Sequence, residues 1–478
     1  MEYEPVAGLE THVELAPKSK VFSSAIAAFG GEPNTQVNPV CLGMPGTLPT
    51  LNRAAFEMSL KAALALQCSI PETTVFDRKH YYYPDLPKNY QISQEYQPLA
   101  RNGNLRIYLK DGRTKDIRIH NIHLEEDAGK LIHQTYKSRP ISLVDLNRAG
   151  TSLLEIVSQP DMESREEVEA YMNTMRSMLR YLEVSDCKMQ EGSLRFELNL
   201  SLRPAGTKEL GIKVEVKNVG SMKAVLRAYD YEIERQTEIL EDGGRVIQET
   251  RLWDDERGET RPMRVKETAK DYRYFPEPDI PPIVLEWEYL QSLEASLPEL
   301  REAKRQRFVK EFGIPDYDAG VLVEDKAVAN YFEECCRLHP APKTFSNWIM
   351  VYILRDLNED FDITEHPIQP KHLAELAQLV EKGTINQNIA KKILSDIQET
   401  GKMPSEIVKE KGLEAVSDSG AIEQIVDEVL AENPGPVQDF KNGKDQTLNF
   451  LLGMAMRKSK GKANPELVKE LIAKKVRG

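Results

Sequence analysis

The chain has 478 residues and a net charge of −13, with 29% charged and 40% hydrophobic residues. This length is too great for one hydrophobic core, so about two to four domains are expected. The acidic balance excludes a protein coated in nucleic acid, and no window is long and apolar enough for a membrane span.

The N-terminus and the cysteines indicate a cytoplasmic protein. Residues 1–5 read Met-Glu-Tyr-Glu-Pro, without the basic and apolar regions of a signal peptide. The five cysteines form no CxxC pair. A disulfide framework and a zinc knuckle are therefore not expected.

Residues 6–15 alternate as in a β-strand. Glu10, His12 and Glu14 share one face of this predicted strand, and the apolar residues share the other. Two carboxylates and an imidazole are good ligands for a divalent cation, although a solvent-facing strand would show the same pattern.

A long loop rich in turn formers follows over residues 22–52, before a predicted helix over 53–67. Basic residues and tyrosines then alternate over 78–91. Such a stretch can stack on a nucleotide or line a polar conduit, and a structural tyrosine-rich loop is an equal alternative.

The most unusual stretch is His-Leu-Glu-Glu-Asp-Ala-Gly-Lys at residues 123–130. It ends a predicted strand over 114–124 that follows an Asp111-Gly112 turn. Three adjacent carboxylates repel one another unless cations or strong donors share the site. The stretch is therefore either a solvated loop or part of a divalent-cation site.

Two later strands again carry mixed charges on one face. The strand over 195–203 alternates apolar residues with Arg195, Glu197 and Asn199, and the strand over 213–218 alternates valines with charged residues. Between the polar run at 145–156 and these strands, a Ser164–Glu167 capping box predicts a helix start. Arginine, lysine and acids on neighbouring strands suit a nucleotide phosphate and its metal, with a solvated sheet face as the alternative.

The second half of the chain reads as helical. A proline-rich run at 276–282 marks a boundary, and later helices are expected to end at Gly383, Gly401 and Gly412. From Lys441 to Arg477 there are ten basic and three acidic residues, so the tail alone could contact a polyanion. No GxxxxGK[ST] or GxGxxG motif is present, so an ATP site would be open and sheet-lined.

Eight motifs in this order resemble the B-subunit family of tRNA-dependent amidotransferases, from about residue 5 to the C-terminus. They are GLETHVEL at 8–15, CLGMPGTLPTLN at 41–52, RKHYYYPDLPKNYQISQ at 78–94, HLEEDAGK at 123–130, DLNRAGTSLLEI at 145–156, EGSLRFELNLSLRP at 191–204, EVKN at 215–218 and DYRYFPEPD at 271–279.

The resemblance implies an α+β protein of three domains. Residues 1–290 would form a catalytic cradle domain, whose sheet lines an open site as in the glutamine synthetase/guanido kinase fold. Residues 291–405 would form a helical domain, and residues 406–478 a helical tail of the YqeY type that binds tRNA.

The resemblance also implies the chemistry. The B subunit uses ATP and Mg²⁺ to phosphorylate the side-chain carboxylate of Glu or Asp on a misacylated tRNA, and ammonia then displaces phosphate. Ammonia reaches it through a channel from an amidase A subunit that hydrolyses glutamine, and a small C subunit completes the heterotrimer. The expected setting is cytoplasmic, without a membrane partner.

The matching motifs also imply which residues form the site. Catalytic roles are expected for Glu125, Asp127 and Lys79, and Lys79, Asp127, Tyr82 and Lys88 resemble polar lining where the channel meets the site. The expected metal ligands are Glu10, His12, Glu125, Glu155 and, more weakly, Glu197. Nucleotide and acyl-phosphate contacts are expected from Arg148, Arg195, Lys217 and Asn218.

The chain departs from the family pattern in two places. Phe196-Glu197 stands where much of the family has Cys-Asp, so Glu197 must fit a site built for a shorter carboxylate. The second departure lies in the 22–41 loop, where many members resemble a small zinc site but this chain has Ser23, Ala25, Asn38 and Cys41. One thiolate cannot hold a structural zinc, so none is expected.

Other functions remain open at this stage. A non-catalytic aminoacyl-tRNA adaptor would bind tRNA without an ATP-dependent step. A stand-alone ligase resembling glutamine synthetase would leave the helical domains and basic tail without a purpose. The archaeal Glu-tRNA paralogue carries a large inserted domain that has no space here. The sequence does not show whether Glu-tRNA, Asp-tRNA or both are used.

Overall fold

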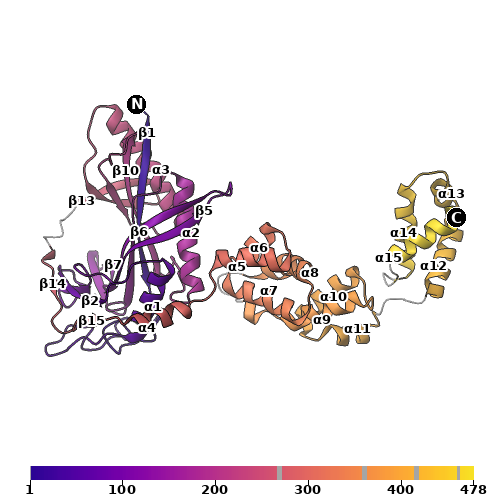
Figure 1. Ribbon diagram of the computed structural model, residues 1–478, viewed down its shortest axis with the longest axis horizontal. Coiled ribbons are helices and arrows are strands. Elements are labelled where there is room, and N and C mark those ends of the chain that lie inside the picture. The colour runs from indigo at the N-terminus through magenta and orange to yellow at the C-terminus, as the bar shows by residue number, and fades with distance from the viewer. Residues whose placement is uncertain are drawn as a thin grey trace. The chain divides into compact units, whose positions relative to one another are not determined.

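A computed structural model of the chain describes residues 2–265, 272–357, 363–413, 419–459, 463 and 465–477. Residue 271, which opens the last of the eight motifs, lies outside these ranges. The chain divides into two compact units, Met1–Leu300 and Arg301–Gly478 (Figure 1). The first is built around a large sheet and the second is helical, which confirms the predicted α+β class in outline. The likeness to glutamine synthetase and guanido kinases stays a prediction.

An eight-stranded sheet organises the N-terminal unit, in the order β13-β12-β11-β10-β1-β9-β6-β5. Neighbouring strands are antiparallel except β11 and β12, which are parallel. The strands are β1 (Tyr3–Glu14), β5 (Ala100–Tyr108), β6 (Thr114–Glu126), β9 (Ser152–Ser158), β10 (Leu194–Pro204), β11 (Val214–Lys217), β12 (Glu249–Asp254) and β13 (Glu259–Val265).

Smaller sheets surround this one. One has the order β14 (Phe275–Pro276), β3 (Asp77–His80) and β4 (Tyr90–Ser93), with β3 in the centre. The other two pair β15 (Ile283–Val284) with β2 (Thr73–Thr74), and β7 (Lys130–Tyr136) with β8 (Arg139–Asp145).

The period of two along the strands divides the sheet into an apolar and a polar face. Leu9 and Val13 of β1 are buried in one core with Leu124 of β6, Leu154 of β9 and Leu198 of β10. Helices α2 (Arg165–Tyr181) and α3 (Met222–Glu241) pack against the sheet and join the same core. The polar residues that alternate with these side chains point to the other face of the sheet.

The start of α2 is fixed by its cap. Ser164 Oγ accepts a 3.2 Å hydrogen bond from the Glu167 backbone N–H, as predicted. The Glu167 carboxylate, however, accepts from the Glu163 N–H instead of closing the capping box on Ser164. Lys115 of β6 also binds Glu167, at 3.0 Å, so the cap and the sheet hold the same carboxylate.

Two more helices complete the N-terminal unit. The predicted helix over 53–67 is α1 (Arg53–Ala65), and α4 (Trp287–Ala295) packs against it. The unit therefore extends to Leu300, past residue 290. The division of the whole chain into three domains remains a prediction.

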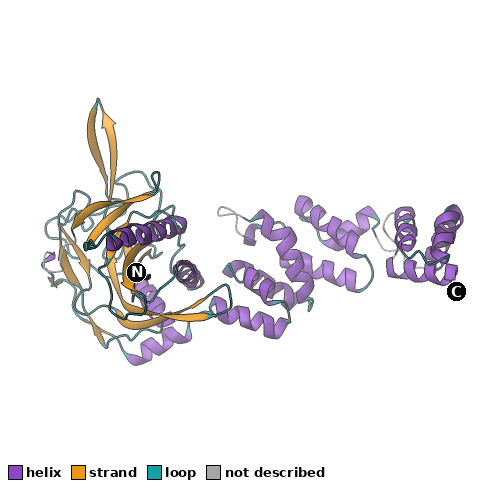
Figure 2. Cartoon of the chain, turned by 90° about the horizontal axis from the view of Figure 1, so that it is seen from above, coloured by secondary structure: helices purple, strands orange, loops and turns teal. Residues whose placement is uncertain are grey.

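The described part of the second unit consists of helices (Figure 2). They are α5 (Arg301–Arg307), α6 (Asp316–Leu322), α7 (Lys326–Leu338), α8 (Pro342–Trp348), α9 (Pro370–Glu381), α10 (Gln387–Thr400), α11 (Pro404–Lys411), α12 (Ser419–Glu432), α13 (Pro434–Lys441), α14 (Gln446–Lys458) and α15 (Pro465–Arg477), with short π- and 3₁₀-helical turns at 308–312, 349–356 and 363–365.

This unit contains two separate hydrophobic cores, one over residues 308–408 and one over residues 422–476. The predicted C-cap glycines are confirmed, because Gly383, Gly401 and Gly412 all have positive φ angles of 56–70° directly after or near a helix end. None of the helices in the described ranges is long and apolar enough to cross a membrane.

Candidate active site

The polar face of the sheet gathers most of the predicted site residues. Strand register sets His123 of β6 opposite Glu155 of β9, Glu155 opposite His12 of β1, and His12 opposite Arg195 of β10. A second row sets Glu10 of β1 opposite Glu197 of β10. Residues opposite each other on adjacent strands lie on the same face. Segments far apart in the sequence therefore form one site.

The first cluster, here called the histidine triad, consists of His12, Glu125 and Glu155. Its ligand atoms lie within 4.8 Å of one another. His12 Nε2 lies 3.3 Å from Glu155 Oε2, and His123 Nε2 lies 3.0 Å from the same oxygen. Ser93 Oγ donates to Glu125 Oε2 at 3.0 Å.

Electrostatics in the histidine triad favour a charged carboxylate between two imidazoles. Burial opposes ionisation of Glu155, but the charges and hydrogen bonds of His123 and His12 lower its pKa well below the ordinary value. Burial disfavours the His12 imidazolium, yet the hydrogen bond to Glu155 raises the pKa of His12 to about 9. The pKa of His123 is raised against burial by the same carboxylate.

The second cluster, here called the glutamate triad, consists of Glu10, Glu197 and Glu215. Its oxygens also lie within 4.8 Å of one another. Lys217 of β11 neutralises part of this charge, with Nζ 2.6 Å from Glu197 and 3.0 Å from Glu215. Burial, followed by the charge of Glu155 and of the other two members, raises the pKa of Glu10. The cluster is thus short of positive charge.

Asp127 and two arginines form the third group. Arg195 Nη2 donates to Asp127 Oδ2 at 2.9 Å, and Arg148 Nε lies 3.5 Å from the same oxygen. Burial opposes ionisation of Asp127, but these arginines lower its pKa. Glu14 lies beside the group, and burial together with the charge of Asp127 raises the pKa of Glu14 to about 8.

The predicted channel-lining residues have different surroundings. Lys79 Nζ lies 4.9 Å from the centre of the Tyr272 ring. Lys88 forms a largely buried ion pair with Glu126, whose carboxylate also accepts from the Ile92 N–H at 2.8 Å. Tyr82 is 67% exposed. These positions are compatible with polar lining, and that role remains a prediction.

Asn218 lies at the end of β11, outside both triads. Its φ angle is 64°, and its side-chain amide donates to the Trp253 carbonyl at 3.2 Å. The residue is exposed. A phosphate could therefore reach its side-chain amide, either beside the Trp253 carbonyl or in its place. Its nucleotide role stays a prediction.

Sequence reasoning missed part of the site. Glu215 belongs to the glutamate triad, and His123 binds Glu155, yet neither was assigned a role. The side chain of Asn199 donates to Glu10 at 2.9 Å. Asn199 and Glu215 lay in strands predicted to have a polar face, so the alternation of side chains already placed both on that face, whereas no face was predicted for the 114–124 strand that contains His123. Only strand register shows which of those polar residues meet.

The donor atoms fit a divalent cation. The histidine triad offers carboxylate oxygens and, once a metal displaces the proton of His12, an imidazole nitrogen. The glutamate triad offers oxygens alone, which suits Mg²⁺. The buried Nδ1 of His12 and Oδ1 of Asn199 have no hydrogen-bond partner in the described structure. Buried polar atoms are normally paired, so these two atoms are consistent with ligands that the protein alone does not supply.

The loop over residues 22–41, where no structural zinc is expected, is held by hydrogen bonds. Ser23 Oγ lies 3.2 Å from Cys41 Sγ, and the Cys41 N–H donates to Asn38 Oδ1 at 3.1 Å. Both metal-ligand clusters found among the described residues lie elsewhere, on the sheet.

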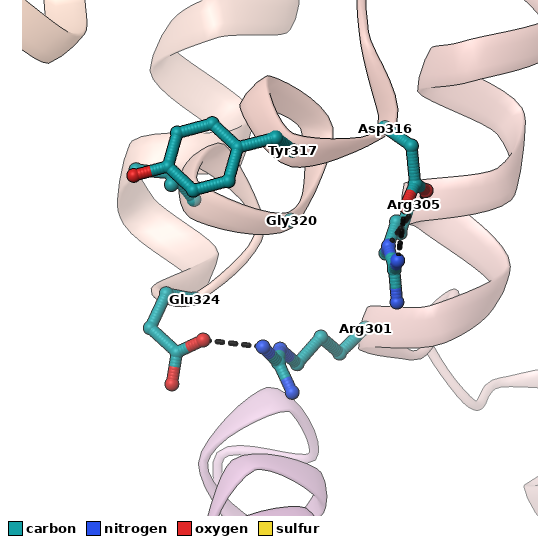
Figure 3. Close-up of a pocket in the computed structure, with 7 residues that line it drawn as sticks. Arg301, Arg305, Asp316, Tyr317, Gly320 and Glu324 are labelled. Atoms are coloured by element: carbon teal, nitrogen blue, oxygen red, sulfur yellow. Dashed lines mark hydrogen bonds and ion pairs between the residues drawn. The ribbon is translucent and has the colours of Figure 1, made fainter. Parts of the chain in front are cut away.

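A hollow of about 470 Å³ in the second unit is a weaker candidate site (Figure 3). Its lining includes Arg301 and Arg305, which could bind a phosphate. Arg305 is paired with Asp316, with Nε 3.0 Å from Oδ1, and Arg301 is paired with Glu324. The hollow contains none of the predicted site residues and none of the metal-ligand clusters in the described part of the chain, so it is the weaker candidate.

The comparisons with known proteins agree with this division of the chain. Residues 5–291 match the family described as GatB/GatE catalytic domain, and residues 330–476 match the family described as GatB domain. The acid-rich sheet therefore belongs to a GatB/GatE-type catalytic domain, followed by a GatB-type helical region.

Whole-chain relatives lead to the same result. The chain is 51% identical over 477 residues to the B subunit of the aspartyl/glutamyl-tRNA(Asn/Gln) amidotransferase of Carboxydothermus hydrogenoformans, covering 99% of each chain. Identity is 51% over 477 residues with the protein of the same name from Moorella thermoacetica, covering 100% of each. It is 49% over 474 residues with that of Persephonella marina, covering 99% of each. The chain belongs to the family of amidotransferase B subunits.

Proposed function

We propose that this chain is the phosphotransfer and amidation subunit of a tRNA-dependent amidotransferase. It acts on Glu-tRNA(Gln), Asp-tRNA(Asn) or both, with ATP and Mg²⁺. An amidase A subunit supplies ammonia from glutamine, and a small C subunit completes the heterotrimer. The names of the relatives support the tRNA substrate. The observation that carries the proposal is that the histidine triad and the glutamate triad lie on one face of the sheet, next to Lys217, Arg148 and Arg195.

The chemistry needs such a site because a carboxylate does not react usefully with ammonia. A side-chain carboxylate oxygen attacks the γ-phosphorus of ATP, and ADP leaves. Ammonia then attacks the carbonyl carbon of the acyl phosphate, the carbon–oxygen bond to phosphate breaks, and a proton is lost. The products are the amide on tRNA, ADP and inorganic phosphate. Phosphoryl transfer depends chiefly on positioning and on cations that stabilise the charge.

The residues divide this work between two sets. The histidine triad and the glutamate triad would hold Mg²⁺, which would supply positive charge to offset that of the phosphate groups. Arg148, Arg195, Lys217 and Asn218 bind phosphate oxygens of ATP and of the acyl phosphate. Lys217 is well placed for this, because it is held at 2.6 and 3.0 Å from two glutamates of one triad.

Lys79, Tyr82, Lys88 and Asp127 form the side from which ammonia arrives. Asp127 accepts hydrogen bonds, and its carboxylate stays charged between two arginines. It can therefore orient ammonia, a neutral N–H donor, toward the carbonyl carbon. Lys79 lies near His123, where its positive charge opposes protonation of the imidazole.

The test uses the heterotrimer rebuilt with A and C subunits. Glu-tRNA(Gln), ammonium chloride, ATP and Mg²⁺ are supplied, and Gln-tRNA(Gln) is measured for wild type, Glu10→Gln, Glu125→Gln and the exposed control Glu209→Gln. We expect product only with ATP, and a loss of about 100-fold or more in both triad variants with unchanged tRNA binding. Full activity in both triad variants would instead support the adaptor function.

A further inference from the structure

The β7–β8 hairpin is the part of the N-terminal unit that the proposed chemistry does not use. Its strands form a separate two-stranded sheet, paired from Lys130 opposite Asp145 to Tyr136 opposite Arg139. Most of its side chains are exposed, and it projects from the rest of the unit (Figure 2). A lone hairpin is at best marginally stable in water. Contact with a binding partner would therefore stabilise this hairpin.

The charge of the hairpin has one sign. Residues 130–144 include Lys130, Lys137 and Arg139 and no acid, in a chain with a net charge of −13. All three cations are exposed. Within the described ranges, none of the three has an ion-pair partner. The tip of the β5–β6 hairpin differs, because Lys110 pairs with Glu169 at 3.1 Å and Arg113 with Asp111 at 2.6 Å.

The tip combines these cations with an aromatic ring. Tyr136 is 57% exposed, and Lys137 Nζ lies 5.2 Å from its ring centre. Lys137 and Ser138 have φ angles of 48° and 61°, which fits a two-residue turn of the type that suits the twist of a hairpin. Cations interleaved with an aromatic side chain form a surface that suits a nucleic-acid backbone better than an apolar protein surface.

The apolar residues of the hairpin have a structural role. Ile132 and Leu143 are directly opposite each other on the two strands. Such cross-strand pairs stabilise a hairpin. Their partial exposure therefore does not require a protein partner.

The base of the hairpin is tied to the active site. Arg148 donates to the carbonyls of Ala128 and Gly129, at 3.0 and 2.8 Å, and also lies 3.5 Å from Asp127. On the other strand, the Asn34 N–H donates to Asp145 Oδ1 at 3.1 Å. The hairpin is therefore a fixed arm. Each strand has 7 residues, which gives a reach of about 20–24 Å at ~3.3 Å per residue.

We propose that the β7–β8 hairpin is an RNA-binding arm that contacts the sugar-phosphate backbone of the aminoacyl-tRNA while its acylated end lies at the triads. The inference rests on the proposed function, because it takes the substrate to be a tRNA whose reacting carboxylate enters the site. Binding by the arm is electrostatic and independent of base sequence.

The test compares two double variants in the full heterotrimer. Lys137→Gln with Arg139→Gln removes the cations at the tip of the β7–β8 hairpin, and Lys110→Gln with Arg113→Gln removes two cations from the tip of the β5–β6 hairpin. The Kd for Glu-tRNA(Gln) is measured over a series of salt concentrations, together with kcat at saturating tRNA, the unfolding temperature and assembly with the A and C subunits.

For the arm variant we expect a Kd about tenfold higher than wild type near 0.1 M salt. The slope of log K against log salt should fall in magnitude by about 1.4–1.8, since each lost phosphate contact contributes about 0.7–0.9. The kcat, unfolding temperature and assembly should match wild type, and the control variant should keep the wild-type Kd and slope.

Unchanged affinity and salt slope in the arm variant would overturn the inference. Loss of assembly without tRNA would also overturn it and would identify the hairpin as a protein-docking surface. If wild type and the arm variant differ in tRNA affinity as expected but wild type makes no amide with ATP and ammonium, the arm is supported and the proposed function fails.

Discussion

Each triad takes its three candidate ligand groups from three neighbouring strands, and the two triads share no residue. A single substitution therefore tests one triad and leaves the residues of the other in place. Glu215 is the most informative position. It is buried, bonded to Lys217 and, at 3.1 Å, to Thr250 Oγ. No part of the hydrophobic core depends on its carboxylate. A change there therefore reports on ligand chemistry more than on packing.

We expect Glu215→Gln to raise the Mg²⁺ concentration needed for half-maximal activity by about 10- to 100-fold, because one of three oxygen ligands becomes a neutral amide. The measurement is an Mg²⁺ titration of amide formation in the heterotrimer. The exposed Glu209→Gln variant should behave as wild type. An unchanged Mg²⁺ requirement in Glu215→Gln would remove the glutamate triad from the metal site.

A different carboxylate, Glu232 on α3, stabilises the fold. It is fully buried and accepts bonds from Arg235 at 2.8–3.0 Å and from Gln236 at 3.0 Å, with Arg251 3.3 Å away. Burial opposes its ionisation, but the arginine and the other donors lower its pKa below the ordinary 4.5. A lowered folded-state pKa means that ionised Glu232 stabilises the protein above pH 4.5, and that this contribution is lost as pH falls through the folded pKa.

Glu232→Gln should therefore reduce the free energy of unfolding at pH 7 by about 3–5 kcal/mol, because it leaves buried arginine charge uncompensated. The gap between wild type and variant should shrink as the pH falls below 4.5. Denaturant titrations across this pH range provide the measurement, with Glu234→Gln on an exposed position of α3 as the control. A gap that stays constant with pH would contradict the account.

At the scale of elements, the base of the β7–β8 hairpin links the arm to Asp127 and Arg148. The Gly129 N–H donates to the Asp85 carbonyl at 2.9 Å. A Cβ at Gly129 would lie 2.8 Å from the Asp145 carbonyl oxygen and 3.1 Å from that of Asp85. Both contacts are too short, and both involve backbone atoms that cannot rotate away.

Gly129→Ala should thus cost about 1–3 kcal/mol of stability through overpacking and lower kcat, because the carbonyls that hold Arg148 must shift. Unfolding and steady-state assays measure the two effects. Gly435→Ala is the control, since nothing lies within 4 Å of a Cβ there. Wild-type kcat in Gly129→Ala would show that the hairpin base does not position the site.

The loop over residues 22–52 is held to the body by its own hydrogen bonds. Asn52 accepts from the Ala54 N–H and donates to the Ser19 carbonyl at 2.8 Å, so it both caps α1 and closes the loop. Cys41 is the one thiol in this loop, so we predict that the loop folds without a structural zinc.

Dialysis against a strong zinc chelator should accordingly leave the unfolding temperature within about 1 °C of the untreated protein, and the purified protein should contain well under one zinc per chain. Calorimetry and elemental analysis measure these values. A stoichiometric zinc whose removal lowers the unfolding temperature would contradict the prediction.

The strands of the site could be predicted because their side chains alternate with a period of two. This period alone placed Glu10 and His12 of β1 on one face, and Arg195 and Glu197 of β10 on one face. Strand order could not be predicted, since β1 pairs with β9 and β10, which lie more than 130 residues away in the sequence. Only the strand order, which places β11 beside β10, shows that Glu215 lies in the site.

The β7–β8 hairpin was missed for a local reason. Its turn is Lys137-Ser138, and neither residue is a usual choice for positive φ. Hairpins with Asn-Gly or Asp-Gly turns are easier to find, as the Asp111-Gly112 turn between β5 and β6 was. The strands also lack a buried face, so they show weak alternation.

At the scale of the whole molecule, some of the basic residues in the C-terminal tail are already paired with acidic residues. The C-terminal tail is basic in sequence, but Lys458 pairs with Glu428 and Glu432, and Lys475 with Glu423 and Asp427. Local acids therefore neutralise part of the tail charge. The exposed, unpaired cations of the hairpin, within the described part of the chain, make it a second candidate for a phosphate-backbone contact.

The most direct test of the central claim follows the oxygen atoms of the substrate. Glu-tRNA(Gln) labelled with ¹⁸O in its side-chain carboxylate is converted by the heterotrimer with ATP, Mg²⁺ and ammonium, and the inorganic phosphate is analysed by mass spectrometry. If the carboxylate is phosphorylated and ammonia displaces phosphate, each phosphate released during amidation carries one ¹⁸O. Amide formation with unlabelled phosphate would contradict an acyl phosphate, and with it the assignment of the triads to phosphoryl transfer.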